Sequence, residues 1–433
     1  MLWRKDTPKA DVVVRGARVL DPVEGVDAVL DVRIDGGGIA AIGTALEANG
    51  HRVIDGDRLL LAPGFVDPHV HLRTPGREDE ETIASGTAAA AAGGYCAILA
   101  MPNTDPVVDS ASVLRSLAES AVEQGAIPVG FLAAISKGSE GGSLSEMGEL
   151  ADCGAVGFSD DGRPVAGAGL MRRALQYSAI TGRPLALHCE EQSLSRDGQM
   201  HEGAVSAELG FTGYPSLAES VMVERDLSIA AYEQLPLHLL HLSAQESVAA
   251  LARAQAAGLR VSGEVTPHHL CLTDDAVRSL DPNVKMNPPL RSGADRTALI
   301  EGLRDGTIAA VATDHAPHAR HEKEVPFEAA PFGVTGLETA FAALYTRLVE
   351  PGLVRLETLL ERMSAGPAQI FGLDRPRIQV GATANLTLID TGASWRVTED
   401  AFRSRSTNSW LLGQTLKGKV RLTVADGRVA FEA

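Results

Sequence analysis

Two histidines, His69 and His71, stand two residues apart at the end of a short apolar run, and this spacing could hold a metal ion. Side chains alternate between the two faces of a strand, so residues two apart project to the same face. Neutral imidazoles gathered on one face are favoured ligands of zinc. Alone, an H-x-H pair is weak evidence, because a chance surface pair is about as frequent as a metal site.

Metal-binding residue types recur where four later apolar runs end. Asp160-Asp161 closes the fourth run, His188 the fifth, His241 the sixth, and Thr313-Asp-His-Ala-Pro-His318 the eighth. Each residue alone is more often a capping or hydrogen-bonded group than a ligand, but five such run ends together favour one shared metal site. Four histidines and two aspartates exceed the needs of one catalytic zinc, which takes three protein ligands and a water. Two zinc ions sharing a carboxylate would use them all, and a water between the ions would be the nucleophile.

The remaining histidines near the run ends are expected to be supporting groups. His238 lies three residues before His241, so the two cannot share a strand face, and only His241 should face the site. His268, His269 and His315 are interpreted as structural groups around it.

These side chains need a scaffold that brings distant run ends together. The middle of the chain alternates apolar runs with stretches of helical composition, which predicts parallel strands joined by right-handed helical crossovers. The apolar runs begin near Gly64, Cys96, Ile127, Ala155, Pro184, Leu237, Val261 and Ile308. The helical stretches include residues 82–92, 110–124, 170–181, 217–234 and 244–257.

Eight strand–helix repeats are what a closed (β/α)8 barrel of the TIM type requires. The active sites of such barrels lie at the carboxyl ends of the strands, which is where the histidines and aspartates fall. A doubly wound open sheet is the alternative, but no G-x-G-x-x-G follows a first strand to support it.

The two ends of the chain are rich in short β segments separated by turns such as Asp35-Gly-Gly-Gly38. They predict a small β-sandwich built from both termini. The expected organisation is therefore residues 1–62 and 373–433 in the sandwich and residues 63–372 in a metal-dependent barrel.

The composition of the chain excludes some classes of binding partner. The net charge is -17 and no Lys/Arg-rich run occurs, which argues against nucleic acid and anionic membranes as partners. The apolar runs are strand-sized, and no apolar signal core follows the first residues, so a cytoplasmic protein is expected. The 4 cysteines are scattered without a C-x-x-C pair and are interpreted as reduced structural thiols.

Seven segments, in order from Gly64 to Glu338, resemble the motifs of dihydroorotases in the amidohydrolase superfamily, specifically class I, found in many bacteria. These segments are Gly64-Phe-Val-Asp-Pro-His-Val-His-Leu-Arg73, Ala100-Met-Pro-Asn-Thr104, Phe158-Ser-Asp-Asp-Gly162, His188-Cys-Glu190, Lys285-Met-Asn-Pro-Pro-Leu290, Thr313-Asp-His-Ala-Pro-His318 and Ala330-Pro-Phe-Gly-Val-Thr-Gly-Leu-Glu338.

The resemblance implies a ligand for every metal position. It places His69, His71 and Asp314 on one zinc, His188 and His241 on the other, and Asp161 as the bridging carboxylate. Many relatives, including hydantoinases, use a carboxylated lysine at the fourth strand instead. No lysine stands there in this chain, which favours the aspartate-bridged dihydroorotase class.

The resemblance also implies the substrate contacts and the reaction. Arg73, Asn103 and His318 would surround the ring carboxylate, with His71 beside them, while Asn287 and the backbone at Phe332–Gly333 would hold the ring amide. Asp314 would be the general base in reversible, zinc-dependent hydrolysis of L-dihydroorotate to N-carbamoyl-L-aspartate in pyrimidine synthesis. A homodimer and an association with aspartate carbamoyltransferase are further implied. Two alternatives stay open: a hydantoinase-like or allantoinase-like hydrolase, and a non-catalytic subunit that only scaffolds the transferase.

Overall fold

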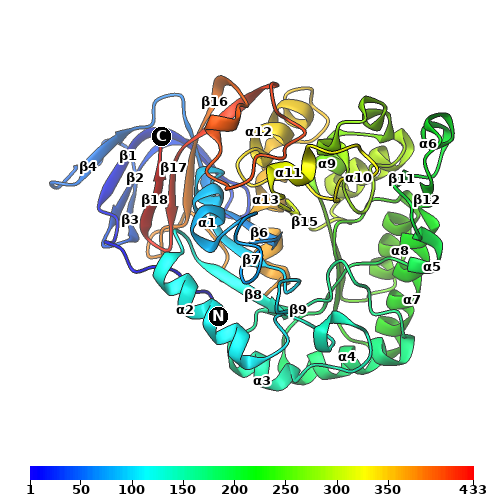
Figure 1. Ribbon diagram of the computed structural model, residues 1–433. Coiled ribbons are helices and arrows are strands. Elements are labelled where there is room, and N and C mark those ends of the chain that lie inside the picture. Colours follow the sequence, from blue (N-terminus) through cyan, green and yellow to red (C-terminus); the bar gives the residue numbers. More distant parts are fainter.

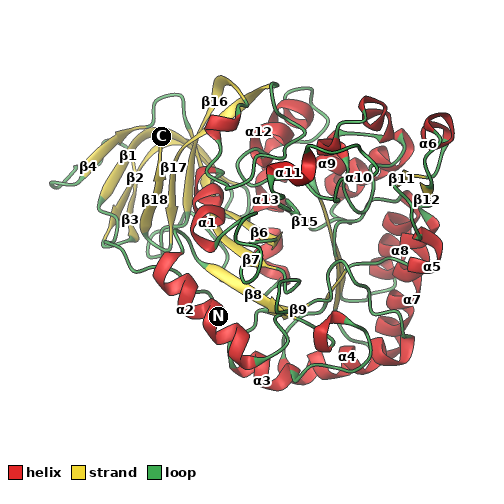
Figure 2. Cartoon of the chain, in the orientation of Figure 1, coloured by secondary structure: helices red, strands yellow, loops and turns green.

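The computed structural model describes residues 1–433 and contains two large sheet regions, besides the small two-stranded sheet of β11 and β12. A curled parallel sheet with helices around it forms the middle of the chain, and a second sheet, built from both ends, lies beside it (Figure 1; Figure 2). None of the helices is both long enough and apolar enough to cross a membrane.

The curled sheet consists of two four-stranded parallel sheets, in the orders β6-β7-β8-β9 and β10-β13-β14-β15. Isolated parallel bridges join them on both sides, Phe158 with Leu185 and Val70 with His315. The strands are β6 (Phe65–Val70), β7 (Tyr95–Ala100), β8 (Val129–Ala133), β9 (Gly157–Phe158), β10 (Ala186–Leu187), β13 (Leu237–Leu239), β14 (Val261–Val265) and β15 (Ala310–Val311). Each begins within two residues of a predicted strand start, so the prediction of a parallel α/β sheet is confirmed.

Helices cover the outer face of the curled sheet. All residues of β6, β7 and β8 are buried, as expected for parallel strands covered on both faces. The main helices are α1 (Ile83–Ala92), α2 (Ala111–Gln124), α3 (Met147–Asp152), α4 (Ala168–Thr181), α7 (Leu217–Glu233), α8 (Gln245–Ala256), α10 (Gly293–Asp305), α12 (Ala340–Leu344), α13 (Leu356–Met363) and α14 (Ala365–Ile370). Shorter elements lie in the loops: α5 (Gln192–Ser195), β11 (Met200–His201), α6 (Ala204–Leu209), β12 (Gly213–Tyr214), α9 (Pro267–Cys271) and α11 (Arg320–Lys323).

Local signals explain where these helices begin and end. The Thr82 side chain accepts a hydrogen bond from Ser85 N, and the Ser85 side chain accepts one from Thr82 N, so this capping box starts α1. Ser292 and Asp295 start α10 in the same way. Gly182, with φ of 67°, adopts the left-handed conformation that ends α4. The five predicted helical stretches are all confirmed.

The second sheet joins the two ends of the chain. Its strand order is β18-β17-β16-β5-β1-β2-β3, with β4 paired to β1, and the antiparallel pair β5–β16 links the N-terminal strands to the C-terminal ones. The strands are β1 (Val12–Asp21), β2 (Val26–Asp35), β3 (Gly38–Gly43), β4 (Arg52–Asp55), β5 (Leu60–Pro63), β16 (Leu386–Arg396), β17 (Thr415–Ala425) and β18 (Arg428–Glu432).

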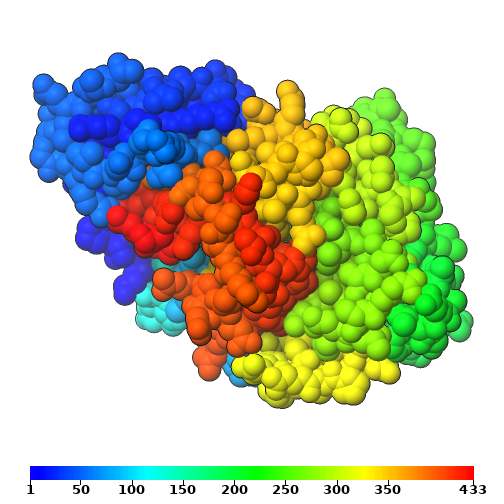
Figure 3. Space-filling model, turned by 90° about the horizontal axis from the view of Figure 1, so that it is seen from above, coloured from blue at the N-terminus to red at the C-terminus, as the bar shows by residue number.

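This terminal sheet has a hydrophobic cluster of its own. Its 15 buried residues come from both ends of the chain and are separate from the 84-residue cluster around the curled sheet. Seen from above, the blue N-terminal and red C-terminal segments lie side by side (Figure 3). Both ends of the chain thus contribute strands to one sheet, whereas the small β-sandwich and the domain boundaries stay predictions.

Candidate metal centre and active site

The six expected metal ligands meet at the carboxyl ends of the parallel strands. His69 lies in β6 and His71 just beyond it, while Asp161, His188, His241 and Asp314 follow β9, β10, β13 and β15. All six are buried. Residues up to 245 positions apart in the sequence thus form one cluster.

One side of the cluster joins the H-x-H pair to Asp314. The Asp314 Oδ1 atom lies 3.0 Å from His71 Nε2 and 3.4 Å from His69 Nε2. The second oxygen, Oδ2, makes no hydrogen bond. Oδ1 therefore faces the two imidazoles, and Oδ2 is left available.

Asp161 lies between two pairs of histidines. Its Oδ2 is 3.5 Å from the Nε2 atoms of both His69 and His71. Its Oδ1 is 3.5 Å from His241 Nε2 and 3.7 Å from His188 Nδ1. One carboxylate thus presents one oxygen to each pair, which is the position required of a ligand shared by two metal ions.

Unpartnered atoms in the cluster fit bound metal. His69 Nε2 and Asp161 Oδ1 are buried and lack a hydrogen-bond partner, although buried polar groups are almost always paired. The ligand atoms of His69, His71 and Asp314, and those of His69, Asp161 and His241, lie within 4.8 Å of one another. Imidazoles with carboxylates are a donor set that zinc accepts. The residues therefore fit a metal centre.

The two aspartates are suited to stay ionised. Burial would raise the pKa of Asp161 and of Asp314, but the neighbouring histidines, His69 above all, hold both values below the ordinary one. An ionised carboxylate can bind a cation or accept a proton.

The backbone is strained at three site residues. Arg73, His241 and Asp314 have φ angles of 55°, 29° and 47°, in the left-handed region that residues with a side chain rarely adopt. Such strain persists only where the surroundings enforce it, and it is often found at functional sites.

Carboxylates and an amide behind the histidines fix the orientation of their rings. Glu264 Oε1 lies 2.9 Å from His69 Nδ1, and Glu190 Oε2 lies 2.9 Å from His188 Nε2. Asn103 Oδ1 lies 2.9 Å from His71 Nδ1. Each contact engages one ring nitrogen and turns the other toward the cluster.

Sequence reasoning missed Glu264 and Glu190 as parts of the site. Glu264 is a charged residue inside the buried strand β14, and Glu190 stands two residues after His188; both positions were available signals. His238 does not contact Asp161; it bonds to Ser262 and Glu264 instead, consistent with its predicted supporting role.

The expected carboxylate-binding residues also lie close together. Arg73 Nε is 2.9 Å from Glu80 Oε2, and His318 Nδ1 is 3.2 Å from Glu80 Oε1. Asn103 Nδ2 donates to Asp161 Oδ2 at 3.3 Å, so Asn103 contacts two of the expected metal ligands, His71 and Asp161. Glu80 is a further residue that the sequence did not single out.

The expected ring-binding groups have mixed surroundings. Asn287 Nδ2 donates to Glu190 Oε2 at 3.1 Å, while its buried Oδ1 has no partner. Phe332 O accepts from His318 Nε2 at 2.7 Å, and Gly333 N donates to Lys285 O at 2.9 Å. A ring contact at Phe332–Gly333 therefore stays a prediction.

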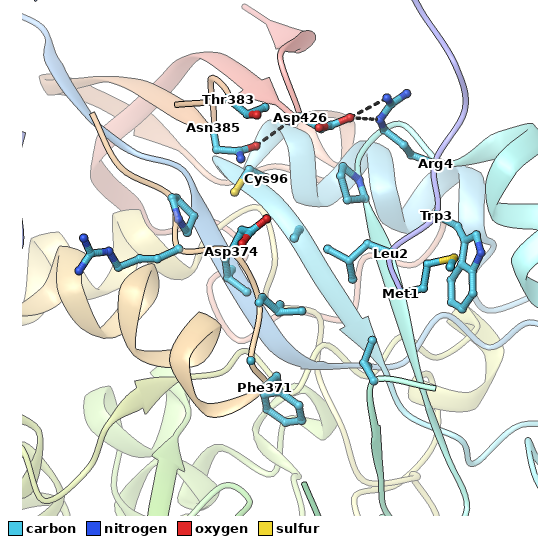
Figure 4. A pocket seen from close by; sticks show the side chains of 18 of the residues that line it. Met1, Leu2, Trp3, Arg4, Cys96, Phe371, Asp374, Thr383, Asn385 and Asp426 are labelled. Atoms are coloured by element: carbon cyan, nitrogen blue, oxygen red, sulfur yellow. Dashed lines mark hydrogen bonds and ion pairs between the residues drawn. The ribbon is translucent and has the colours of Figure 1, made fainter. Parts of the chain in front are cut away.

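A wide cavity lies at the other end of the curled sheet. Its volume is about 1060 Å³, and it is lined by residues at the starts of strands, including Val66 and Cys96, together with Met1 to Arg4 and Phe371 (Figure 4). It contains none of the clustered histidines and is separate from the candidate site.

Comparisons with known proteins match almost the whole chain. A family model described as dihydro-orotase-like matches residues 57–247. Proteins named dihydroorotase from Geobacter metallireducens and Geobacter sp. (strain M21) are 44% and 45% identical, each over 98% of this chain and 100% of the relative.

Solved structures of similar fold are hydantoinases and dihydropyrimidinases. L-hydantoinase from Arthrobacter aurescens superimposes with a TM-score of 0.87 at 26% identity, over 98% of this chain and 96% of that one. Dihydropyrimidinase from Brevibacillus agri gives a TM-score of 0.84 at 23% identity, over 97% of this chain and 94% of that one, and shows the common fold alone.

Proposed function

This chain belongs to the dihydroorotase family, and from that premise we propose that its buried histidine–aspartate cluster is a two-zinc centre. The reaction is the hydrolysis of a cyclic amide: dihydroorotate is reversibly opened to N-carbamoyl-aspartate, a step of pyrimidine synthesis. The observation that carries the metal proposal is the position of Asp161, with one oxygen toward each histidine pair.

The proposed ligands are divided between the two ions. His69, His71 and Asp314 would hold one zinc, His188 and His241 would hold the other, and Asp161 would be the ligand that the two ions share. Zinc bound there would polarise the carbonyl that is attacked and activate a water as nucleophile. The strand ends that supply the ligands are proposed to belong to one closed (β/α)8 barrel, because bridges join the two parallel sheets on both sides.

Asp314 is the proposed general base. Its carboxylate is held ionised, and its Oδ2 makes no hydrogen bond. It can accept a proton from the attacking water and return it to the ring nitrogen that leaves. This transfer prevents the departing nitrogen from carrying a negative charge.

The substrate is proposed to be oriented from two sides. Arg73, Asn103 and His318 bind the ring carboxylate, and a guanidinium is well matched to that group. Asn287 Nδ2 donates to Glu190 Oε2 and its Oδ1 has no partner, so Asn287 is suited to accept a ring N–H. The backbone at Phe332–Gly333 completes the ring contacts.

The test combines metal analysis with a comparison of substrates. The purified chain is expected to contain about two zinc ions, as its ligand set requires, and to hydrolyse dihydroorotate in preference to hydantoin and allantoin. Preference for hydantoin would contradict the substrate. A metal-loaded chain with no turnover of any of the three would indicate the non-catalytic scaffold instead.

The remaining organisation follows from the family resemblance. Residues 1–62 and 373–433 are proposed to form a small β-sandwich beside a barrel of residues 63–372. A homodimer and an association with aspartate carbamoyltransferase are proposed as well. Size-exclusion chromatography of the chain, alone and mixed with the transferase, tests both assemblies.

A further inference from the structure

Glu80 is a buried carboxylate surrounded by three cationic or basic side chains. Its side chain is 3% exposed. Its Oε2 lies 2.9 Å from Arg73 Nε, and its Oε1 lies 3.0 Å from Arg77 Nη2 and 3.2 Å from His318 Nδ1. Two of these three partners, Arg73 and His318, are the residues proposed to bind the substrate carboxylate.

The contact with Arg73 determines which edge of the guanidinium is free. Arg73 Nε also donates to Pro317 O at 3.1 Å, so this nitrogen is fully engaged. The terminal nitrogens Nη1 and Nη2 have no hydrogen-bond partner. A carboxylate can therefore bind Arg73 only end-on, through the two terminal nitrogens.

The contact with His318 joins two loops of the site. Arg73 and Glu80 lie in the loop between β6 and α1, whereas His318 lies in the loop after β15. His318 Nε2 donates to Phe332 O at 2.7 Å, so the two ring nitrogens are held from opposite sides. Glu80 thereby fixes the distance between the two loops and the direction of the imidazole.

Glu80 is not itself suited to bind a cation from solution. Glu80, His318 and Glu322 are close enough to hold a metal ion, but Arg77 is 2.8 Å from Glu322 and 3.0 Å from Glu80. A guanidinium already occupies the position that an added cation would need, and like charges repel.

We propose that Glu80 is a positioning residue: it holds the Nε edge of Arg73 and so presents the two terminal nitrogens of this guanidinium to the carboxylate of the substrate. This inference rests on the proposed function of the site, because it assumes that Arg73 binds that carboxylate. It assigns no contact between Glu80 and the substrate. Glu80 acts through Arg73, while its contact with His318 holds the two loops together. Glu80 would therefore favour binding of a carboxylated ring over the same ring without a carboxylate.

The experiment uses the zinc-loaded protein and the variant Glu80→Gln, which keeps the shape and removes the charge. The KM for dihydroorotate is expected to rise about tenfold to a hundredfold, the effect of losing one or two charged hydrogen bonds. The dissociation constant of orotate, an analogue that keeps the carboxylate, should rise by a similar factor. The inhibition constant of dihydrouracil, which lacks it, and the zinc content should be unchanged.

Asp79→Asn is the matched control. Asp79 neighbours Glu80, but its side chain is 53% exposed and pairs only with Arg77. This variant should leave KM, the orotate affinity and the zinc content at the wild-type values. Glu80→Asp keeps the negative charge, but its side chain is shorter by one methylene group, so the carboxylate lies farther from Arg73. It should raise KM less than Glu80→Gln.

Two outcomes would overturn the inference. One is an unchanged KM in Glu80→Gln; the other is an equal loss of affinity for dihydrouracil, which would indicate a general structural role. If Glu80→Gln does not fold, the same ligand comparison in Glu80→Asp decides. Failure of the proposed function would be seen differently, as absence of dihydroorotate turnover in the wild type and in Asp79→Asn.

Discussion

The Nδ1 atom of His69 lies 2.9 Å from the Oε1 atom of Glu264, and both side chains are completely buried. The other Glu264 oxygen lies 3.0 Å from His238 Nε2. Burial would raise the pKa of Glu264, but its hydrogen bonds with His238 and His69 lower it to about 2. The Glu264 carboxylate is therefore ionised and accepts a hydrogen bond from the protonated Nδ1 of His69. The other ring nitrogen of His69, Nε2, carries no proton and can bind a metal.

Removing this charge should weaken metal binding. In Glu264→Gln, we expect zinc affinity to fall about tenfold to a hundredfold, as is usual when a carboxylate behind a ligand histidine is lost. Competition with a chromogenic chelator measures it. Glu246→Gln, on the exposed surface of α8, is the control and should bind zinc normally. Equal affinities in the two variants would remove Glu264 from the metal site.

The role of Asp314 can be tested by an isosteric change. Asp314→Asn should fold normally but lower kcat by about a hundredfold or more, because the amide cannot accept the proton of the attacking water. Steady-state turnover of dihydroorotate with measured zinc content is the readout. The exposed Asp197→Asn should retain full activity. A nearly normal rate in Asp314→Asn would assign the base elsewhere.

The strand positions could be predicted because each strand is a short apolar run with a turn or helix on either side. The run beginning at Leu237 is an example: it begins where β13 begins, and the following stretch of helical composition becomes α8. The small elements between Gln192 and Tyr214 could not be predicted. They are two to six residues long, too short to show a period in the sequence.

The metal ligands could be predicted because histidines and aspartates fall at the ends of the predicted strands. The carboxylates that contact the site residues could not be predicted. Glu264 and His69 are 195 positions apart, and nothing local to either residue indicates the contact. Glu80 stands in an acidic stretch, Glu78-Asp-Glu-Glu81, in which Asp79 is exposed and Glu80 is buried. Only the folded arrangement around Arg73 and His318 distinguishes these two carboxylates.

Arg73→Lys tests whether the shape of the guanidinium matters. Lysine has one terminal nitrogen, so it cannot satisfy Glu80 and Pro317 O while also binding a carboxylate with two donors. The KM for dihydroorotate should rise about tenfold or more, while kcat changes less. Arg58→Lys, at a side chain that is 91% exposed, is the control. An unchanged KM would assign Arg73 a different role.

Metal removal should affect stability as well as activity. A ligand that binds only the folded state stabilises it in proportion to the logarithm of its free concentration. The midpoint of thermal unfolding should therefore fall on chelation and rise again with added zinc. Asp161→Asn weakens the ligand that faces both histidine pairs. The unfolding midpoint of this variant should therefore change much less on chelation and on addition of zinc. The same response in both proteins would show that the zinc effect arises elsewhere.

Lys323 provides a test of the loop after β15 that depends on pH. Its ammonium group is buried and donates to the carbonyls of Pro282 and Pro331 at 3.1 and 2.7 Å, and burial lowers its pKa from 10.5 to about 7. Between about pH 7 and pH 10 the unfolded chain keeps a proton that the folded chain releases, so this residue makes the folded state more stable as pH rises.

The free energy of unfolding of the wild type minus that of Lys323→Met should therefore increase from pH 7 to pH 9.5, measured by urea unfolding at about half-unit steps. The same difference for Lys137→Met, at a side chain that is 57% exposed, should stay constant. A difference for Lys323→Met that does not vary with pH would mean that this lysine stays charged in the folded protein.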